Sequence, residues 1–443
     1  MDTPLSSFIA TTGTGQHTKT IPDDPTPRDQ AIYVPSLPPG FCKDIYAKNW
    51  SRALPKGVTP DDLNILNPNS KLLNLSYVMT SAGQALNQSR PCIITSRNRA
   101  SSVVLVDSGG YQTATSGLMV TTNAQRQKLL SWQESVGDIC LSLDIPTGPL
   151  MNTGKPYVCA TQRECLTKTI EHLDYWQQNH TPGKVRWLNI LQGNDQRFAD
   201  MWYSETMKHA DFCNGVAFAG PLRHNFDHVI GRLLQMAEEN RLQGMSHIHC
   251  LGTAELDVAV IWTAIQRAIN RHINPTLRIS YDTGAPSKML RWNQIYSLPR
   301  FDGNSMTMQS VDAPDGPEFL HSTRRWPWPS EIGDAMLMKD FVVRPNKPNA
   351  RYRDTLSNHL MVHHNIGSLC AGIALANRVF DVQIVNHRHE IGRQVGAAIE
   401  AVERIFESGG NQAVFQKLKG VFTLLRHGKK LDAGDDLRDL DKS

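Results

Sequence analysis

The sequence predicts an α/β fold, and within that class a closed (β/α)8 barrel of the TIM type. Two observations predict this fold. Short apolar or β-branched segments alternate with longer amphipathic segments at steps of roughly 30 to 50 residues, which is typical of successive strand–helix–strand units. Eight of the short segments can be counted, and eight parallel strands covered by helices can close into a barrel.

Each expected strand is short, apolar or β-branched, and is followed by turn residues. The eight expected strands are 92–95, 103–106, 139–143, 187–191, 216–218, 248–251, 277–281 and 382–385. The expected helices between them are 123–137, 161–179, 195–211, 225–242 and 254–270. Thr161 and Glu164 have the spacing of a capping box, which supports a helix start there. An open doubly wound sheet is the alternative, but no G-x-G-x-x-G loop follows the first strand.

Polar residues or glycines stand where several expected strands end. Asp107, Asp144 and Asp282 each close one strand, and Gln192 and Gly220 follow two others. A single aspartate in this position commonly caps a turn through its own side chain. In a closed barrel, however, the carboxyl ends of all strands meet at one rim, where active sites lie. Three aspartates at that rim therefore predict an active site.

The segment Asp-Ser-Gly-Gly-Tyr-Gln at 107–112 resembles the DSGG(F/Y)Q motif of tRNA-guanine transglycosylases. Five further segments are similar to motifs of that family in the same order along the chain. They are Leu-Gln-Gly at 191–193, Ala-Gly-Pro-Leu at 219–222, Leu-Gly-Thr at 251–253, Tyr-Asp at 281–282 and Val-Asn-His at 385–387. The resemblance covers about residues 90 to 415 and implies an enzyme that exchanges a base at a nucleoside.

The resemblance implies roles for two of the aspartates. Asp282 matches the family's nucleophile, which would attack C1′ of the sugar and form a covalent glycosyl-enzyme. Asp107 would act as general acid and then as general base, protonating the leaving guanine and deprotonating the incoming 7-deazapurine. Two carboxylates suit this chemistry because breaking a glycosidic bond passes through an oxocarbenium-like transition state. The acid–base role requires a pKa that burial and neighbouring carboxylates move toward neutrality.

The same resemblance implies a set of residues that bind the base. Guanine presents donors at N1 and its exocyclic amine and an acceptor at O6, so a carboxylate and an amide suit it. Asp144 and Gln192 supply that pair, and the backbone at Gly220 could add a donor. Tyr111 could stack on the ring, which is worth roughly 1 to 3 kcal/mol for an unpaired base.

Three neighbouring small residues allow two interpretations. The hydroxyl of Ser108 could touch the substrate, or it could simply belong to a tight turn. Gly109 and Gly110 permit positive φ and let a substrate approach the backbone closely.

The chain lacks the zinc motif of the tRNA enzymes, which is C-x-C-x-x-C followed by a histidine. No cysteine lies between Cys250 and Cys370, so we expect no metal and no other cofactor. His359, His363 and Cys370 would share one face of a helix and leave open a different zinc site. A buried histidine cluster is the other interpretation.

The P-T-R segment that follows the nucleophile in the tRNA enzymes is also missing after Asp282. These departures favour the DNA-guanine transglycosylase (DpdA) branch, whose members insert a 7-deazaguanine, typically the 7-cyano form preQ0, into DNA. The expected partners are therefore DNA and a 7-deazaguanine base, with tRNA as the alternative polymer. Extracting guanine from a duplex costs a few kcal/mol, so a helper protein that opens the strands is a further candidate partner.

Basic residues gather between 323 and 353, with two tryptophans among them. The basic side chains expected to contact nucleic acid are Arg324, Arg325, Arg344, Lys347 and Arg351. Such side chains suit phosphate contacts, and Trp326 and Trp328 could stack on bases. In the alternative interpretation this is a solvated loop whose tryptophans are buried against the barrel.

The chain has 443 residues, a length that fits one large barrel. Its net charge of +4 is too small to indicate a polyanion partner by itself. We expect an extended arm at 1–60, the barrel at 61–415 with a helical and basic insertion at about 300–355 before the last strand, and a basic then acidic tail at 416–443. Eight cysteines without regular spacing or a secretory leader indicate a reduced, cytoplasmic protein. No apolar stretch approaches the length of a membrane span.

Two other classes of function stay open. The chain could be a catalytically idle homologue that binds nucleic acid, although such a protein has no chemical need for all three aspartates. It could also be an unrelated barrel hydrolase or lyase that acts on a small metabolite. That class explains the carboxylates but not the ordered series of Gln192, Gly220 and Asp282.

Overall fold

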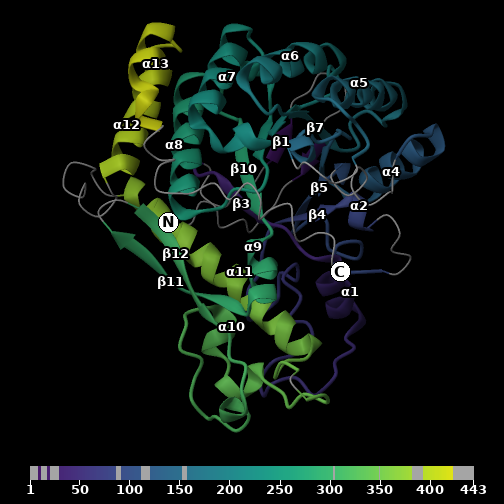
Figure 1. Cartoon of the computed structure of the whole chain (residues 1–443), viewed down its shortest axis with the longest axis vertical. Helices are drawn as coiled ribbons and strands as arrows, with labels where there is room; N and C mark the ends of the chain where they lie inside the picture. The colour runs from purple at the N-terminus through teal and green to yellow at the C-terminus, as the bar shows by residue number, and fades with distance from the viewer. Residues whose placement is uncertain are drawn as a thin grey trace.

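Eight parallel strands form a nearly closed barrel surrounded by helices in the computed structural model of the chain (Figure 1). The structure describes residues 8–10, 17–19, 29–85, 91–110, 120–151, 157–302, 305–348, 350–381 and 393–422. The barrel strands are β3 (Ile32–Pro35), β4 (Tyr77–Ser81), β5 (Val103–Asp107), β6 (Ile139–Leu141), β7 (Arg186–Leu191), β8 (Gly215–Phe218), β9 (His247–Cys250) and β10 (Arg278–Thr283). Their order in the sheet is β3-β10-β9-β8-β7-β6-β5-β4. The predicted (β/α)8 fold is confirmed.

The first and last strands of this order, β3 and β4, meet at a short junction that closes the sheet. Ser36 forms a parallel bridge with Met79, and the backbone N–H of Leu37 donates to the carbonyl of Met79 at 2.9 Å. The two outer strands of the order therefore meet each other at this junction, where an open sheet would have two free edges.

Two strands differ from the prediction. Residues 92–95 form a turn, in which the hydroxyl of Thr95 accepts from the N–H of Cys92 at 2.9 Å, and not a strand. The barrel uses β3 and β4 instead, which lie earlier in the chain in a region rich in turn residues. The other six expected strands that can be compared fall on β5 to β10. The expected strand at 382–385 lies outside the described residues.

The helices that cover the barrel include all five that the sequence predicts. The helices are α1 (Pro39–Ala47), α2 (Ala82–Ala85), α4 (Asn123–Val136), α5 (Gln162–Asn179), α6 (Gln196–Thr206), α7 (Phe226–Glu238), α8 (Leu256–His272), α9 (Ala285–Lys288), α10 (Glu331–Asp334), α11 (Thr355–Asn377), α12 (Arg393–Glu407) and α13 (Gln412–Leu418). At the start of α5, the hydroxyl of Thr161 accepts from the N–H of Glu164 at 3.2 Å, as the capping pattern predicts. None of the described helices is long and apolar enough to cross a membrane.

Alternation of side chains along the strands divides the core into an inner and an outer part. One apolar cluster contains strand residues only, among them Val103, Leu105 and Leu141, and therefore fills the barrel interior. Residues at the intervening positions, such as Ile248 and Ile279, pack outward against α7 and α8. Both clusters are buried, so most of the strands are apolar on both faces, as parallel barrel strands usually are.

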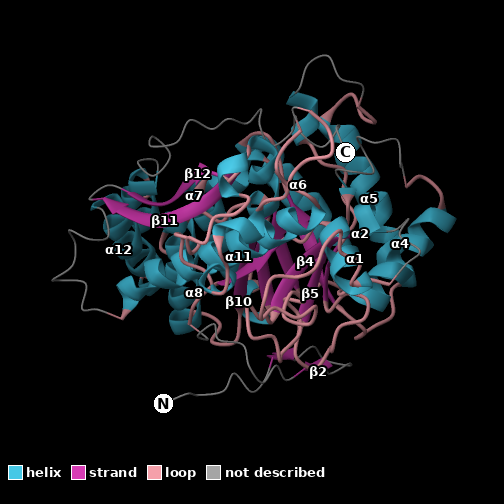
Figure 2. Cartoon of the chain, turned by 90° about the horizontal axis from the view of Figure 1, so that it is seen from below, coloured by secondary structure: helices cyan, strands magenta, loops and turns pink. Residues whose placement is uncertain are grey.

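The insertion begins after β10 with an antiparallel hairpin, β11 (Gln294–Asp302) and β12 (Ser305–Asp312). A lobe with little regular structure follows, which contains α10 and lies at the lower end of the molecule in Figure 1. The long helix α11 packs against both β11 and α8 and so joins this lobe to the barrel, as the view from below in Figure 2 also shows. Since β10 is the eighth barrel strand, the insertion follows that strand, whereas the sequence placed it before the last one.

The N-terminal region is only partly the arm that was expected at 1–60. Two short strands, β1 (Phe8–Ala10) and β2 (His17–Lys19), pair with each other and stand apart from the barrel sheet. From β3 onward, however, the chain belongs to the barrel, because β3 pairs with β10 in parallel. Of the tail expected at 416–443, the structure describes residues up to 422, which include the end of α13.

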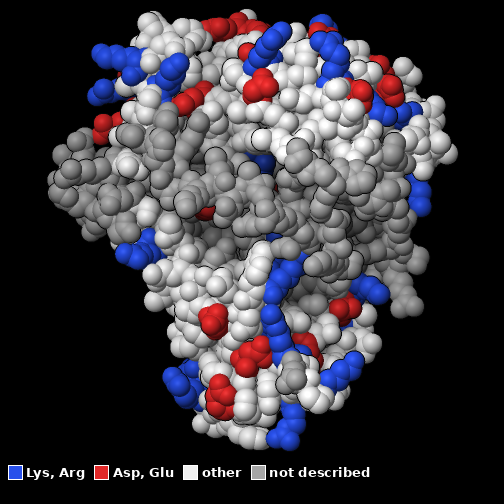
Figure 3. All heavy atoms as spheres, in the orientation of Figure 1, with Lys and Arg blue, Asp and Glu red and all other residues white. Residues whose placement is uncertain are grey.

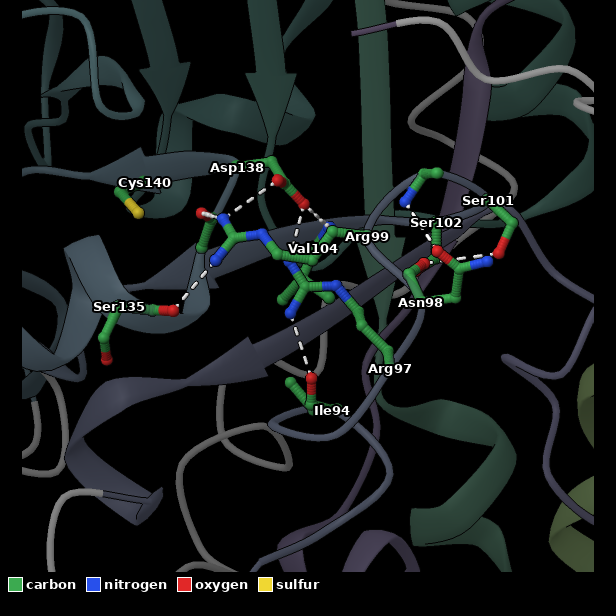
Figure 4. A network of polar contacts seen from close by, with 12 residues as sticks. Ile94, Arg97, Asn98, Arg99, Ser101, Ser102, Val104, Ser135, Asp138 and Cys140 are labelled. Carbon is green, nitrogen blue, oxygen red and sulfur yellow. Dashed lines mark hydrogen bonds and ion pairs between the residues drawn. The ribbon is translucent and has the colours of Figure 1, made fainter.

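A charged network holds the amino-terminal end of the barrel together (Figure 4). Asp138, just before β6, accepts hydrogen bonds from Arg97 Nη2 at 2.7 Å and from the backbone N–H of Val104 at 2.9 Å through Oδ2. Its Oδ1 accepts from Arg99 Nη2 at 3.1 Å. The Arg97 side chain is only 2% exposed, so one carboxylate neutralises a buried guanidinium and ties β5 to the turn before it.

We expect Asp138→Ala to lower the free energy of unfolding by about 3 kcal/mol, because it leaves the buried Arg97 guanidinium without its counter-charge. Urea unfolding of the two proteins measures the difference. Asp61→Ala is the control, since Asp61 pairs with Lys48 on an exposed surface and should cost less than about 1 kcal/mol. Equal losses in the two variants would contradict a structural role for the Asp138 network.

Candidate active site

The three aspartates that the sequence singled out lie at the carboxyl-terminal rim of the barrel. Asp107 is the last residue of β5, Asp144 follows β6, and Asp282 is the second-to-last residue of β10. Because the strands are parallel, their carboxyl ends share one rim, and the chain brings together carboxylates up to 175 positions apart in sequence. Asp144 and Asp282 are buried, at 5% and 6% exposure.

Asp144 and Gln192 form a direct pair. Gln192 Nε2 donates to Asp144 Oδ2 at 2.7 Å and to the carbonyl of Ile145 at 3.2 Å. Its other amide atom, Oε1, accepts from the backbone N–H of Thr147 at 2.9 Å, which fixes the orientation of the amide. Ser108 Oγ donates to the second Asp144 oxygen at 3.4 Å. A carboxylate and an amide are thus held side by side, buried, and facing the same rim.

Glycines let the backbone pack closely around these groups. Gly110 lies against Asp144, where a Cβ would come within 2.3 Å of the Asp144 carbonyl oxygen. Gly109 has φ +76°, and a Cβ there would meet the backbone of Gly83 at 2.3 Å. Both positions therefore require glycine on steric grounds, whether or not a substrate binds nearby. Gly220 has φ +68° beside Gln192, and its carbonyl accepts from Arg223 Nη1 at 2.7 Å.

Asp107 has the near-neutral pKa that an acid–base role requires. Its pKa is raised from 3.8 to about 6, with burial as the largest cause and the nearby charge of Asp282 as a further one. Hydrogen bonds from Ser81 and from the N–H of Gly109, the latter at 3.2 Å, act in the opposite direction, as does His249. The expected movement toward neutrality is found, with burial as its main cause.

Burial also raises the pKa of Asp144, from 3.8 to about 7, with the charge of Asp107 as the second cause. The hydrogen bonds from Ser108 and Gln192 lower it again in part. At neutral pH this carboxyl is therefore near its midpoint, so it can exchange a proton with a ligand or with water at little cost.

The carboxylate of Asp282 is held by one oxygen. Oδ1 accepts from the backbone N–H of Gly252 at 2.7 Å. Within the described part of the chain, Oδ2 has no hydrogen-bond donor, and the side chain is 9% exposed. An oriented, largely desolvated carboxylate with one oxygen unengaged has the geometry of a nucleophile.

Several residues of the rim escaped the sequence interpretation. Ser81 lies opposite Asp107 in the β4–β5 ladder, but β4 was not predicted, so no signal pointed to it. Thr147 lies in a loop without a recognisable motif. His249 could have been found from the sequence, because it lies on an expected strand two residues after His247. Both are polar residues in an apolar run and would point to the same face of the strand. Tyr111 was predicted to stack on a base and lies outside the described residues.

The predicted nucleic-acid contacts lie in the lobe after β12. All five predicted residues are exposed, namely Arg324, Arg325, Arg344, Lys347 and Arg351. Figure 3 shows basic side chains running along one face of the lower lobe toward the middle of the molecule, with acidic ones among them. Arg351 also has a structural role, because its guanidinium donates to the carbonyls of Leu290 and Arg291, both at 3.1 Å.

The tryptophans of this lobe are part of its core. Trp326 is 6% exposed and stacks on Phe341 with ring centroids 3.7 Å apart. Its indole N–H donates to His364 Nδ1 at 3.2 Å. The ring of Trp328 packs edge-on against Trp326. The interpretation in which these tryptophans are buried is therefore correct for Trp326, which cannot stack on a base.

Two histidines of α11, His359 and His364, are engaged with protein groups. His359 Nε2 lies 3.0 Å from Asp44 Oδ2, and His364 Nε2 lies 2.9 Å from the carbonyl of Tyr296. Burial lowers the pKa of both His363 and His364 to about 4. In the part of the chain that the structure describes, no group of three or more His, Cys, Asp or Glu side chains could hold a metal ion. The zinc site left open at His359, His363 and Cys370 is thus wrong, and the histidine cluster is the correct interpretation.

Fold and site together define this chain as a (β/α)8 barrel protein with a cluster of buried carboxylates at its carboxyl-terminal rim. No protein-family model matches the sequence, and a search of curated proteins finds no significant match. Since (β/α)8 barrels carry many unrelated chemistries, function has to be argued from the residues of the site.

We expect Asp144→Asn to stabilise the protein at pH 8 and to leave its stability unchanged near pH 4. The folded state binds the Asp144 proton more tightly than the unfolded state, since its pKa rises from 3.8 to about 7. Stability is therefore lost as pH rises through this window. Asparagine removes the loss, which is on the order of 2 to 4 kcal/mol.

Thermal or urea unfolding at pH 4, 6 and 8 measures this difference. Asp211→Asn, at an exposed position, is the control and should change stability little at any of these pH values. A variant that is less stable than the wild type at pH 8 would show that the Asp144 carboxylate is not the costly group.

Proposed function

We propose that the protein is a pentosyltransferase, a guanine transglycosylase that exchanges guanine in DNA for the 7-deazaguanine base 7-cyano-7-deazaguanine (preQ0). The observation that carries the proposal is the grouping of Asp107, Asp144, Gln192 and Asp282 at one rim, in the order and positions that the resemblance to tRNA-guanine transglycosylases implies. The different environments of the carboxylates match the different roles.

In the proposed reaction, the free oxygen of Asp282 attacks C1′ of the nucleoside as the bond from C1′ to guanine N9 breaks. The bonding electrons leave with guanine, which takes a proton from Asp107. The pKa of about 6 suits this step, because Asp107 can hold a proton near neutrality and release it afterwards. Asp107 then removes a proton from the incoming base, whose nitrogen attacks C1′ and frees Asp282. Each exchange thus returns both aspartates to their starting states.

Asp144 and Gln192 are proposed to bind the base. In the resting protein Gln192 Nε2 donates to Asp144, so a bound base would replace this 2.7 Å contact. The ionised carboxylate would accept from guanine N1–H and the exocyclic amine, and the amide N–H would donate to O6. A ligand that supplies two donors favours the charged form of Asp144, which lowers the cost of ionising a carboxyl whose pKa is about 7.

The choice of DNA over tRNA rests on the missing zinc and P-T-R motifs, and tRNA is the alternative polymer. The exposed basic side chains of the lobe after β12 are proposed to contact the phosphate backbone. Since a base in a duplex must be extruded before the rim can reach it, single-stranded DNA is the simpler substrate, and a helper protein would be needed only for duplexes.

We expect Asp282→Asn to abolish base exchange, lowering the rate by on the order of 10⁴-fold or more, because asparagine cannot act as the nucleophile. Wild type and variant are incubated with radiolabelled guanine or preQ0 and with single-stranded DNA or tRNA. Incorporation is counted, and a denaturing gel is used to look for a protein–polymer adduct. Asp312→Asn, at an exposed position at the end of β12, is the control and should exchange like the wild type.

The polymer decides between the alternatives. Exchange into DNA with an Asp282-dependent adduct supports the proposal. Exchange into tRNA alone would move the activity to tRNA and contradict the DNA assignment. Absence of exchange into either single-stranded DNA or tRNA would contradict a transglycosylase function altogether.

The basic lobe gives a separate expectation. The triple variant Arg324→Glu, Arg344→Glu and Lys347→Glu should bind single-stranded DNA at least about tenfold more weakly, with a salt dependence reduced by about one phosphate contact per lost cation. Fluorescence anisotropy at several salt concentrations measures both quantities. Lys128→Glu, exposed on α4, is the control. Equal affinities at every salt concentration would show that the lobe does not bind the polymer.

A further inference from the structure

A chain of buried polar side chains lies directly below the Asp282 carboxylate, inside the barrel. The chain consists of His247 and His249 on β9 and Ser280 on β10, and all three residues are completely buried. Most of the barrel interior around them is filled by apolar side chains such as Leu105, Leu141 and Leu188. Polar groups in such a place are costly unless they bond to each other or serve a function.

The strand register places these residues in one column. Along β10, Arg278, Ser280 and Asp282 alternate with outward-facing residues and therefore point inward. His247 and His249 do the same on β9. The parallel pairing puts Ser280 beside His249 and Arg278 beside His247. The column thus ends at Asp282 on the rim and at Arg278 at the opposite end.

Polar contacts run along the column from His247 to Asp282. The Ser280 hydroxyl lies 2.7 Å from His247 Nε2 and 2.8 Å from His249 Nδ1. The other ring nitrogen of His249, Nε2, lies 3.4 Å from Asp282 Oδ1. Within the described residues this buried nitrogen makes no hydrogen bond of ordinary length, so the Asp282 carboxylate is the group it faces.

The hydroxyl of Ser280 has a single proton and can donate to only one ring, and the Asp282 carboxylate that faces His249 Nε2 favours the order in which this nitrogen carries a proton. With one proton on each imidazole, His247 donates from Nε2 to Ser280, and Ser280 donates to His249 Nδ1. The proton of His249 is then on Nε2, directed at Asp282, because the bond made by one ring nitrogen sets the state of the other. Burial is the largest cause that lowers the pKa of His247, and the charges of Arg186 and Arg278 act in the same direction, which favours the uncharged ring.

We propose that His249 is a positioning residue that donates its Nε2–H to Oδ1 of Asp282. Ser280 and His247 hold the ring of His249 in the tautomer that this bond requires. The inference rests on the proposed function, in which Asp282 is the nucleophile. Together with the N–H of Gly252 at 2.7 Å, His249 engages Oδ1 and leaves Oδ2 directed at the substrate. A contact of 3.4 Å is long, and catalytic hydrogen bonds that are long in the free protein commonly shorten in the substrate complex.

Two consequences distinguish this role from simple core packing. First, the column has a defined proton order that a packing role does not require. Second, the carboxylate of Asp282 depends on a donor that is not in contact with the substrate, so removing this donor should lower the rate of the covalent step more than it weakens substrate binding.

The proton order can be read in the wild-type protein without any substrate. Long-range proton–nitrogen NMR spectra of protein labelled with 15N-histidine report which ring nitrogen carries the proton. We expect Nε2–H on both His247 and His249, and we expect Asp282→Asn to shift the His249 Nε2–H resonance while the His247 resonance moves little. A proton on His249 Nδ1 alone, or no response to Asp282→Asn, would overturn the proposal.

Variants of the column supply the second test. We expect His249→Leu to lower kcat for base exchange by about 10²-fold with KM within about threefold, the size of effect seen when one oriented donor to a reacting group is removed. His249→Gln should recover much of this loss, because its amide N–H can reach the same carboxylate oxygen.

Ser280→Ala should give a smaller loss of kcat than His249→Leu, because the ring remains but is no longer held. Ser368→Ala is the matched control, since Ser368 is a buried serine that bonds to the carbonyl of Pro329 far from the rim. It should cost stability but leave kcat and KM unchanged.

The outcomes separate the inference from the function on which it rests. A thermal unfolding transition shows whether His249→Leu is folded. If the wild type exchanges bases and the folded His249→Leu variant does so at the same rate, the positioning role is contradicted and the transglycosylase function is not. If the wild type exchanges no base, the proposed function fails, and the NMR spectra alone decide whether His249 donates to Asp282.

Discussion

Closure of the parallel sheet between β3 and β4 is the constraint on which the site depends. The bridge between Ser36 and Met79 converts an open row of strands into a ring, so that the end of β5 and the end of β10 face each other across one rim. Without closure, Asp107 and Asp282 would belong to well-separated strands of an open sheet. Closure alone brings them near enough for Asp282 to raise the pKa of Asp107.

The rim stores free energy as unfavourable burial of charge. Asp107 and Asp144 both have raised pKa values with burial as the first cause, which means that the fold works against their ionisation. The opposite end of the barrel stabilises the folded state, because the Asp138 carboxylate there accepts hydrogen bonds from two arginines and a backbone N–H. The rim and the base of the same strands thus divide the demands of chemistry and stability between them, as is usual in (β/α)8 barrels.

Much of the fold was predictable because its signals are local. Six strands and five helices follow from apolar runs, amphipathic spacing and a capping pair at Thr161. The strands β3 and β4 were missed because they lie in a stretch rich in turn residues, so only pairing with β10 and β5 identifies them as strands. The fate of Trp326 was likewise open, since a tryptophan among arginines fits both a binding loop and a core.

The sequence by itself determined the (β/α)8 class and the positions of Asp107, Asp144, Gln192 and Asp282 at strand ends, because strand periodicity and turn chemistry act over a few residues. Only the tertiary structure decided which groups surround these side chains. Ser81 and the column of His247, Ser280 and His249 come to lie beside the aspartates through strand pairing, and the N–H of Thr147 holds the amide of Gln192 that bonds to Asp144. Burial and the fields of neighbouring charges, which set the pKa values, exist only once those segments are packed together.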